Sequence, residues 1–458
     1  MGVRRTAAPL AAAVVLLLCL AECGAGQGGP EQYLVDTSSL PGAEGLEVPF
    51  AMYAGYIQLP GTGKHSFFMF FESQASPETD PLLLWMNGGP GASSLYGAMK
   101  ENGPLHVDEA LQLSLNPHSW NTVANVLYLE SPVLVGFSYS TDESDYLDQN
   151  DNQTAIDNYE FLVSWFDVFD SFKANAFYIS GESYGGHYCP QLAHTVLERN
   201  ALLPAGKQMN LRGMLVGNAW TDEFWDGTWS PPRYAYGRGL VSLATYEQLM
   251  TACEGMFNVT SAACETATQQ WKEEQGNDGI LARGFNQLML YEPCYPDAVL
   301  QPVEGEAFRH PIGCVNCTAV TAWLNDAATM EAIHATLQSG MWGAETQLQY
   351  TDQAASVLPL YPALMDAIDV LIFSGDSTTN VNFMGSDAWI RNFGQAVTDE
   401  WRQWTWTDVP NLGQQVGGWT VGYEKIRFVT VLGAGHMVPQ YRPGPALAML
   451  QYYLSGTF

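Results

Sequence analysis

Apolar residues along the chain gather in short, nearly continuous runs that are bounded by Gly, Pro or Asn. Such runs are typical of strands buried on both faces of a parallel sheet. Between the second and third runs, apolar residues recur at helical spacing and predict a helix over residues 154–173. Strands alternating with helices predict a doubly wound, mostly parallel α/β domain. The predicted strands are residues 82–86, 126–130, 176–180, 211–216, 370–374 and 427–432.

Residues 224–356 break this alternation, because they carry helix-like segments, a Pro231-Pro232 pair and a cluster of cysteines. We interpret this stretch as a largely helical, cysteine-containing cap insertion between two parts of one domain, residues 27–223 and 357–458. Clustered cysteines are typical of disulfide-stapled segments in an oxidising compartment. With Cys189 expected to stay a buried thiol, five cysteines remain here, and their pairing cannot be deduced.

The first 26 residues have the pattern of a secretory signal peptide. Arg4 and Arg5 precede an apolar run over residues 10–20, and small residues follow. The alternative is a membrane anchor, but this run is too short, and no later run reaches about 18 apolar residues. We therefore predict a secretory-pathway protein without a membrane span, destined for a vacuole, a lysosome or the cell exterior. Asn152, Asn258 and Asn316 begin glycosylation sequons, which have meaning in such a protein.

The net charge of −30 excludes some partners, because an acidic surface repels nucleic acid and anionic headgroups. We expect no nucleic-acid partner, and we note that an acidic surface suits an acidic compartment. The Cys314-x-x-Cys317 pair lacks the second half of a zinc site. With no nucleotide-binding loop either, we expect no metal and no other cofactor.

Ser183 lies in a Gly-x-Ser-x-Gly motif between a predicted strand and a helical segment. In that context the serine stands on a sharp turn and serves as a nucleophile. The alternative is a glycine-rich turn with a solvated serine. His436 and Asp376 each follow a predicted strand, and the chain order serine, acid, histidine is that of the α/β-hydrolase fold. We predict that His436 moves the proton and that Asp376 orients its imidazole.

A tetrahedral intermediate needs hydrogen-bond donors aimed at its oxyanion. The glycine-rich stretch after the predicted strand 82–86 offers the backbone N–H of Gly89, and the N–H of Tyr184 would complete the oxyanion hole. The alternative for this stretch is a simple tight turn.

Taken together, these motifs resemble the serine carboxypeptidase family, over about residue 48 to the C-terminus, with the insertion least similar. The motifs are Asn87-Gly88-Gly89-Pro90-Gly91-Ala92-Ser93-Ser94, Glu101-Asn102-Gly103-Pro104, Glu130-Ser131-Pro132, Gly136-Phe137-Ser138-Tyr139-Ser140, Gly181-Glu182-Ser183-Tyr184-Gly185-Gly186 and Gly435-His436-Met437-Val438-Pro439.

The resemblance implies an exopeptidase that releases C-terminal amino acids from peptides and proteins through an acyl-enzyme. It assigns Asn87, the Gly88 backbone, Glu101 and Glu182 to the substrate carboxylate. Two carboxyl groups bind a third only if protons are shared, so we expect binding to weaken as pH rises.

Tyr184 and Met437 adjoin the catalytic residues and are expected to line the substrate pocket. The family resemblance also leaves a homodimer possible.

Ala92, Leu134-Val135 and Thr378 depart from the usual family residues without touching the three catalytic positions. Two other functions stay open. One is a carboxypeptidase-like acyltransferase, which Glu101 and Glu182 make less favoured. The other is a non-catalytic protective or binding protein, which a Ser183→Ala variant would distinguish from an enzyme.

Overall fold

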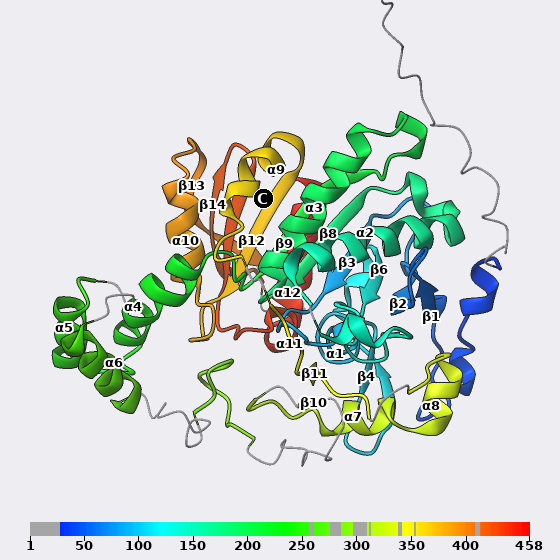
Figure 1. Cartoon of the computed structure of the whole chain (residues 1–458), viewed down its shortest axis with the longest axis horizontal. Coiled ribbons are helices and arrows are strands. Elements are labelled where there is room, and N and C mark those ends of the chain that lie inside the picture. The colour runs from blue at the N-terminus through cyan, green and yellow to red at the C-terminus, as the bar shows by residue number, and fades with distance from the viewer. Residues whose placement is uncertain are drawn as a thin grey trace, which may run out of the picture.

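The computed structural model describes residues 28–147, 149–255, 261–274, 285–295, 309–310, 313–337, 341–351, 354–407 and 413–458. Its centre is an eleven-stranded sheet, counted over these residues, in the order β1-β2-β6-β3-β8-β9-β12-β15-β14-β13, with β7 paired to β2 (Figure 1). The strands are β1 (Met52–Gln58), β2 (Lys64–Phe71), β3 (Leu82–Met86), β6 (Asn125–Leu129), β7 (Tyr139–Ser140), β8 (Phe177–Glu182), β9 (Leu211–Gly217), β12 (Asp369–Gly375), β13 (Val397–Trp406), β14 (Gln415–Tyr423) and β15 (Ile426–Val431).

The strands from β6 to β15 in this order run parallel, whereas the edge strands pair antiparallel. This parallel block consists of the strands predicted from the apolar runs, each displaced by at most a residue or two. The prediction of a mostly parallel sheet is therefore confirmed. Because all these strands point the same way, their carboxyl ends meet at one edge, where ligands bind in open α/β sheets.

Both faces of the sheet are buried, which explains why the runs are continuous. In β12, Leu371 and Phe373 belong to one hydrophobic core, and Val370 and Ile372 belong to the other. This alternation follows from the two-residue period of a strand.

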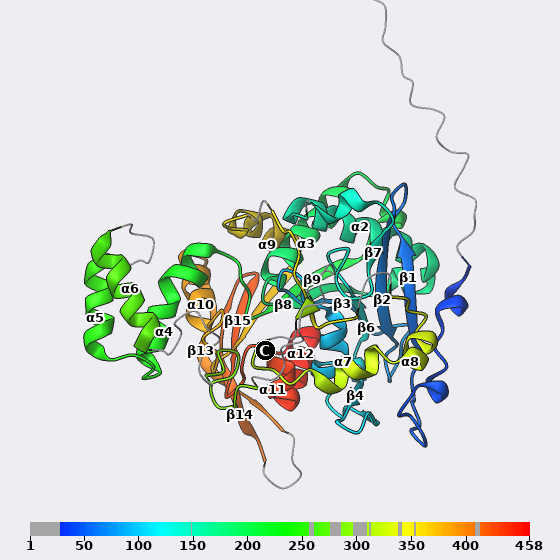
Figure 2. The ribbon, with the colours of Figure 1, turned by 60° about the horizontal axis from the view of Figure 1, so that its bottom comes forward.

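Helices cover the two faces (Figures 1 and 2). On the face of the second core lie α2 (Asp151–Val168), α3 (Gly185–Ala201), α9 (Tyr361–Ala367) and α10 (Phe383–Asn392). The first core receives side chains from α1 (Ser94–Tyr96), α7 (Thr318–Leu324), α11 (Val438–Tyr441) and α12 (Pro443–Ser455). A small hairpin, β4 (Leu105–Val107) and β5 (Leu113–Leu115), lies apart from the main sheet.

Helix α2 starts earlier and ends earlier than the predicted helix over residues 154–173. The Asn150 side chain accepts a hydrogen bond from the Gln153 N–H at 2.9 Å and caps the new start. At Phe169 the backbone leaves the helical region, and a short 3-10 helix over Asp170–Ala174 follows.

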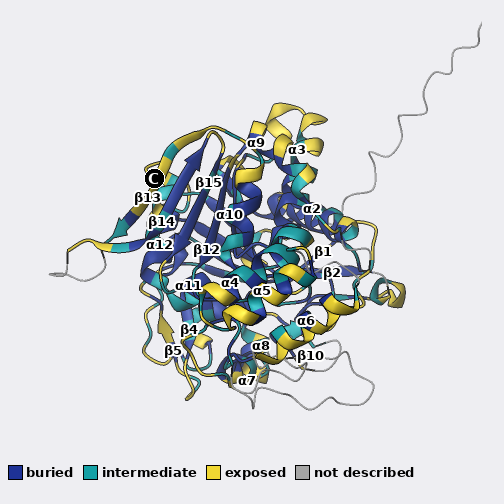
Figure 3. Ribbon diagram, turned by 90° about the vertical axis from the view of Figure 1, so that its left-hand side faces the viewer, coloured by how far each residue is buried: buried dark blue, intermediate teal, exposed yellow. Residues whose placement is uncertain are grey.

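The segment predicted as an insertion begins with a π-helical stretch, Glu223–Trp229, and continues into α4 (Ser230–Gly237), α5 (Leu243–Ala252) and α6 (Ala262–Glu274). In Figures 1 and 2, α5 and α6 lie away from the sheet. Figure 3 shows their exposed outer residues in front of the buried strands. Farther along are α8 (Ala327–Ala332) and a two-stranded sheet of β10 (Arg309–His310) and β11 (Glu345–Thr346).

Two disulfides staple this segment, Cys253–Cys264 between α5 and α6, and Cys294–Cys314. Cys189 is a buried thiol, as predicted, and Cys317 is buried outside these two bonds. The predicted signal peptide lies outside the described residues. Within the described ranges, every helix falls short of the length and apolar character that a bilayer crossing requires.

Candidate active site

Ser183 occupies the turn between β8 and α3, as its motif predicts. Its backbone has φ +59°, in the left-handed region that non-glycine residues rarely adopt. Its N–H donates to the Gly217 carbonyl at 2.9 Å, and its own carbonyl accepts from Gly186 and Trp220 at 2.8 Å each. A strained turn that neighbouring backbone holds in this way fixes the direction of the serine side chain.

Gly88 brings a second loop directly onto this turn. A β-carbon on Gly88 would lie 2.2 Å from the Tyr184 nitrogen and 2.9 Å from Ser183 Cβ. Only glycine permits so close an approach. The loop after β3 therefore packs its backbone against the serine.

Two backbone donors in this region are unused. Neither the Gly89 N–H nor the Tyr184 N–H donates a hydrogen bond to another described residue. Tyr184 is buried, and buried backbone N–H groups are almost always paired in proteins, so its open donor is suited to a ligand oxygen. Gly89 is exposed, so its N–H faces solvent beside the same serine.

His436 lies on the loop after β15 and is 4% exposed. Its N–H donates to the Leu288 carbonyl at 2.7 Å, and its Nδ1 lies 3.0 Å from the Asn380 carbonyl oxygen. Because a carbonyl oxygen can only accept, Nδ1 carries the proton, which leaves Nε2 as the basic nitrogen. Burial lowers the pKa of His436 to about 4, and the Asn380 carbonyl opposes part of that shift.

Asp376 follows β12, next to β15, so its loop and the His436 loop lie side by side. A β-carbon on Gly375 would lie 2.0 Å from the Gly435 oxygen. The carboxylate Oδ1 of Asp376 accepts from the Gly433 N–H and the Ser377 hydroxyl, both at 2.8 Å.

The structure thus brings the loops of the three predicted catalytic residues to one edge of the sheet. Among the described residues, however, no hydrogen bond joins His436 to Asp376 or to Ser183. The Asn380 carbonyl stands at Nδ1, where the sequence predicts the carboxylate.

The predicted carboxylate-binding residues form a connected, buried group beside Gly88. Asn87 Nδ2 donates to Glu101 Oε1 at 2.8 Å and to Glu182 Oε1 at 3.0 Å. The Asn87 Oδ1 in turn accepts from the Trp85 indole N–H at 2.7 Å. Glu101 and Glu182 are 1% and 4% exposed. Asn87 therefore holds two buried carboxyl groups together.

These two carboxyl groups favour their protonated forms. Burial raises the pKa of Glu101 to about 7, against the opposing effect of its hydrogen bonds with Asn87 and Glu182. Burial also raises the pKa of Glu182 well above its ordinary value, and the neighbouring Glu101 charge adds to the shift. A buried pair of this kind holds protons up to neutral pH and can share them with a third carboxylate.

Comparison with known proteins decides the family. A family model described as serine carboxypeptidase matches residues 41–456. The chain belongs to the serine carboxypeptidase family. Its relatives include serine carboxypeptidase-like 20 of Arabidopsis thaliana, 36% identical over 94% of each chain. Serine carboxypeptidase 1 of Hordeum vulgare is 34% identical over 92% of this chain and 93% of that protein.

A solved structure with the same fold is that of Kex1Δp, a prohormone-processing carboxypeptidase from Saccharomyces cerevisiae. It has a TM-score of 0.76 and 21% identity, and the match covers 94% of this chain and 97% of that one. At this identity the likeness establishes the fold, which is the α/β-hydrolase fold predicted from the sequence.

The sequence assigned no site role to Glu130, which is fully buried in this member of the family. Its carboxylate accepts from the Ser93 hydroxyl and the Phe137 N–H, and from the Trp342 indole N–H at 3.0 Å. These contacts tie the Gly88–Gly89 loop to the segment predicted as the cap. The sequence carries one sign of this role, because Glu130 is a charged residue at the end of a predicted buried strand.

Tyr184 and Met437 are 5% and 2% exposed, and their role in the substrate pocket stays a prediction. The Tyr184 hydroxyl donates to Asp151 Oδ1 at 3.0 Å, and its ring stacks on His187 at 4.7 Å between centroids. The phenol is thus anchored to α2 while its backbone N–H faces Gly88.

Two of the three predicted glycosylation asparagines are described. Asn152 is exposed at the start of α2, and Asn316 is half-buried. Asn258 lies outside the described residues. Within the described ranges, His, Cys, Asp and Glu form no group that could hold a metal ion.

Proposed function

We propose that this protein is a serine-type carboxypeptidase that releases C-terminal amino acids from peptides and proteins through an acyl-enzyme on Ser183. The observation that carries the proposal is the buried Asn87–Glu101–Glu182 group beside Gly88, which packs on the serine turn. A protonated carboxyl pair next to a nucleophile is suited to hold a terminal carboxylate one residue beyond the bond that is cleaved.

The proposed reaction proceeds in two halves. Ser183 Oγ attacks the carbonyl carbon while His436 Nε2 takes its proton, and the N–H groups of Gly89 and Tyr184 stabilise the oxyanion. The imidazolium then gives that proton to the leaving nitrogen, and the C–N bond breaks to release the terminal amino acid. Water, activated by His436, hydrolyses the ester and restores Ser183.

Asp376 is proposed to act on His436 through the loop that it holds. Its carboxylate accepts the Gly433 N–H, three residues before His436, and places a negative charge near the imidazolium as it forms. The Asn380 carbonyl holds the Nδ1 proton in the resting state.

Activity is proposed to be strongest in acid. His436, with a pKa of about 4, is a free base above that pH, whereas Glu101 keeps its proton until about pH 7. The two limits define a window from about pH 4 to 7. Such a window suits a vacuole or lysosome reached through the secretory pathway, with residues 1–26 as the signal peptide, though the cell exterior stays open.

The experiment is digestion of an N-blocked pentapeptide at pH 5, followed by mass spectrometry. The proposal predicts stepwise loss of single residues from the C-terminus, and no loss with Ser183→Ala. Internal cleavage would contradict an exopeptidase. Intact peptide, together with acyl transfer from an activated ester to an added alcohol, would instead establish the acyltransferase.

A further inference from the structure

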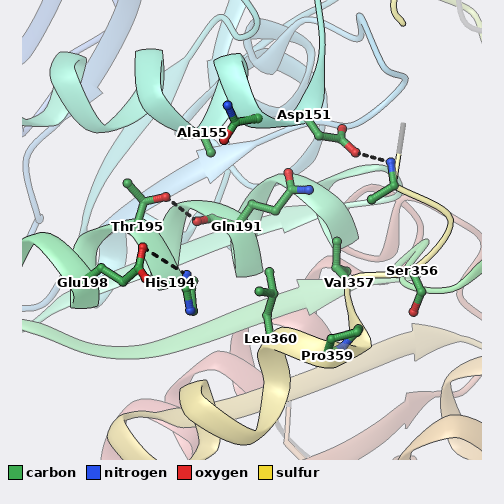
Figure 4. A pocket seen from close by; sticks show the side chains of 12 residues that line it. Asp151, Ala155, Gln191, His194, Thr195, Glu198, Ser356, Val357, Pro359 and Leu360 are labelled. Carbon is green, nitrogen blue, oxygen red and sulfur yellow. Dashed lines mark hydrogen bonds and ion pairs between the residues drawn. The ribbon is translucent and has the colours of Figure 1, made fainter. Parts of the chain in front are cut away.

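A cavity of about 430 Å³ lies on the α2 and α3 face of the sheet, away from Ser183 (Figure 4). The start of α2, the middle of α3 and residues 354–360 form its walls, and none of the proposed catalytic residues lines it. Its volume falls within the range of about 300 to 1,000 Å³ that is typical of small-ligand pockets.

The walls of this cavity combine apolar surface with neutral hydrogen-bonding groups and with three titratable side chains, Asp151, His194 and Glu198. Figure 4 places Gln191 and Thr195 of α3 opposite Val357 and Leu360. The Gln191 Oε1 is buried and has no hydrogen-bond partner among the described residues. Apolar patches next to amide and hydroxyl groups are suited to the C–H face, hydroxyls and acetamide of a sugar.

Asn152, the first residue of a glycosylation sequon, itself lines this cavity and is exposed. The sequon threonine, Thr154, is 1% exposed, and its hydroxyl donates to the Asn150 carbonyl at 2.8 Å. The folded helix therefore hides the threonine from a transferase, so any glycan must be attached before α2 forms.

We propose that Asn152 carries an N-linked glycan whose first sugar, N-acetylglucosamine, occupies this cavity. The sugar comes from a lipid diphosphate-linked oligosaccharide of the secretory pathway. The Asn152 amide nitrogen forms a bond to C1 of the sugar and loses a proton, while the bond between C1 and the diphosphate breaks and the lipid diphosphate leaves. This proposal rests on secretion and does not depend on the proposed peptidase activity.

A sugar bound in this cavity stabilises contacts that position Tyr184 in the active site. It covers the place where Asp151 Oδ2 accepts the Ala354 N–H at 2.8 Å. The other oxygen of Asp151 accepts the hydroxyls of Tyr184 at 3.0 Å and Tyr350 at 2.8 Å. Stabilising this junction holds Tyr184, whose N–H is the proposed oxyanion donor.

The test uses the whole chain, made with its own N-terminal segment in eukaryotic cells. Mass spectrometry of the Asn152 peptide locates the glycan. The native protein is then treated with one of two enzymes. An endoglycosidase leaves one sugar on Asn152, whereas a peptide N-glycanase, the amidase of this test, hydrolyses the bond between the first sugar and the asparagine nitrogen and so removes every sugar. We expect the endoglycosidase to act freely and the amidase to act at least tenfold more slowly on Asn152 than in the denatured protein.

Variants distinguish the binding of the first sugar in the cavity from the attachment of the glycan to Asn152. Gln191→Ala should make Asn152 susceptible to the native amidase, and Asn152→Gln should lower the unfolding midpoint by about 2 °C. Thr154→Ser is the matched control, because it keeps the sequon. An unmodified Asn152 in the secreted protein would overturn the proposal. So would a glycan that the native amidase removes as fast as from the denatured chain, a result that needs no variant.

Discussion

The buried pair of Glu101 and Glu182 should control how KM depends on pH. Burial raises the pKa of Glu101 to about 7 and that of Glu182 well above its ordinary value, so the pair keeps its protons in acid and begins to lose them near pH 7. The perturbation that isolates this effect is Glu101→Gln. A glutamine keeps the acceptor for Asn87, donates N–H to a substrate carboxylate and cannot ionise.

The size of the effect follows from two magnitudes. An ionised Glu101 repels a carboxylate about 4 Å away by roughly 4 kcal/mol at an effective dielectric of 20, and each 1.4 kcal/mol is tenfold in affinity. Enzyme with an ionised Glu101 therefore contributes almost nothing to substrate binding, and KM rises in proportion as the fraction of enzyme with a protonated Glu101 falls. With a pKa of about 7, that fraction falls about tenfold from pH 5 to pH 8.

The assay measures KM and kcat for an N-blocked dipeptide at pH 5, 7 and 8. The wild-type KM should rise about tenfold, and that of Glu101→Gln should stay within about threefold, because burial still holds the proton on Glu182. The matched control is the exposed Glu109→Gln, which should follow the wild type. A dipeptide ester without a free carboxylate should show a flat KM. A wild-type KM for the free acid that is equally flat would refute the reasoning.

Three further results are expected. Asp376→Asn should lower kcat by about 10³-fold or more, because the His436 imidazolium loses the negative charge that stabilises it. A loss under tenfold would mean that Asp376 only holds the Gly433 loop in place. Gly88→Ala should lower kcat at least 100-fold and lower the free energy of unfolding in urea by about 1 to 3 kcal/mol, because its β-carbon would lie 2.2 Å from the Tyr184 nitrogen. Gly206→Ala is the control, because its β-carbon would enter open space, and it should change neither kcat nor stability. The free energy of unfolding, measured by denaturant titration, should fall as pH rises from about 4.5 to 7, because the folded-state pKa of Glu101 lies above its unfolded value. Glu101→Gln removes this ionisation and should be about 3 kcal/mol more stable than wild type at pH 8.

The parallel strands could be predicted from the sequence because both of their faces are buried, as the alternation in β12 illustrates. The turn at Ser183 could be predicted for a related reason. Glycine at position 181 signals backbone too close for a β-carbon, since that carbon would lie 2.4 Å from the Met86 oxygen, and at Gly185 it would lie 3.2 Å from the same oxygen. Chain order then placed Asp376 and His436 at the same sheet edge.

The partners of these residues could not be predicted in the same way. The Asn380 carbonyl at His436 Nδ1 is a backbone atom, so no residue type indicates it. The Asp151 contacts with Tyr184 and Tyr350 join residues up to 199 positions apart. Contacts of that kind depend on how α2 packs against the segment that closes the insertion, a tertiary property that local patterns do not carry.

The measurement that tests the central claim most directly is covalent labelling of the folded protein with a phosphonofluoridate at pH 6, followed by peptide mapping. Such a reagent forms an adduct with a serine that a base activates. The account predicts one adduct per chain, on Ser183, and its loss in His436→Gln. An adduct on another serine, or none on the folded wild-type protein, would contradict the claim that Ser183 and His436 form a nucleophile and its base.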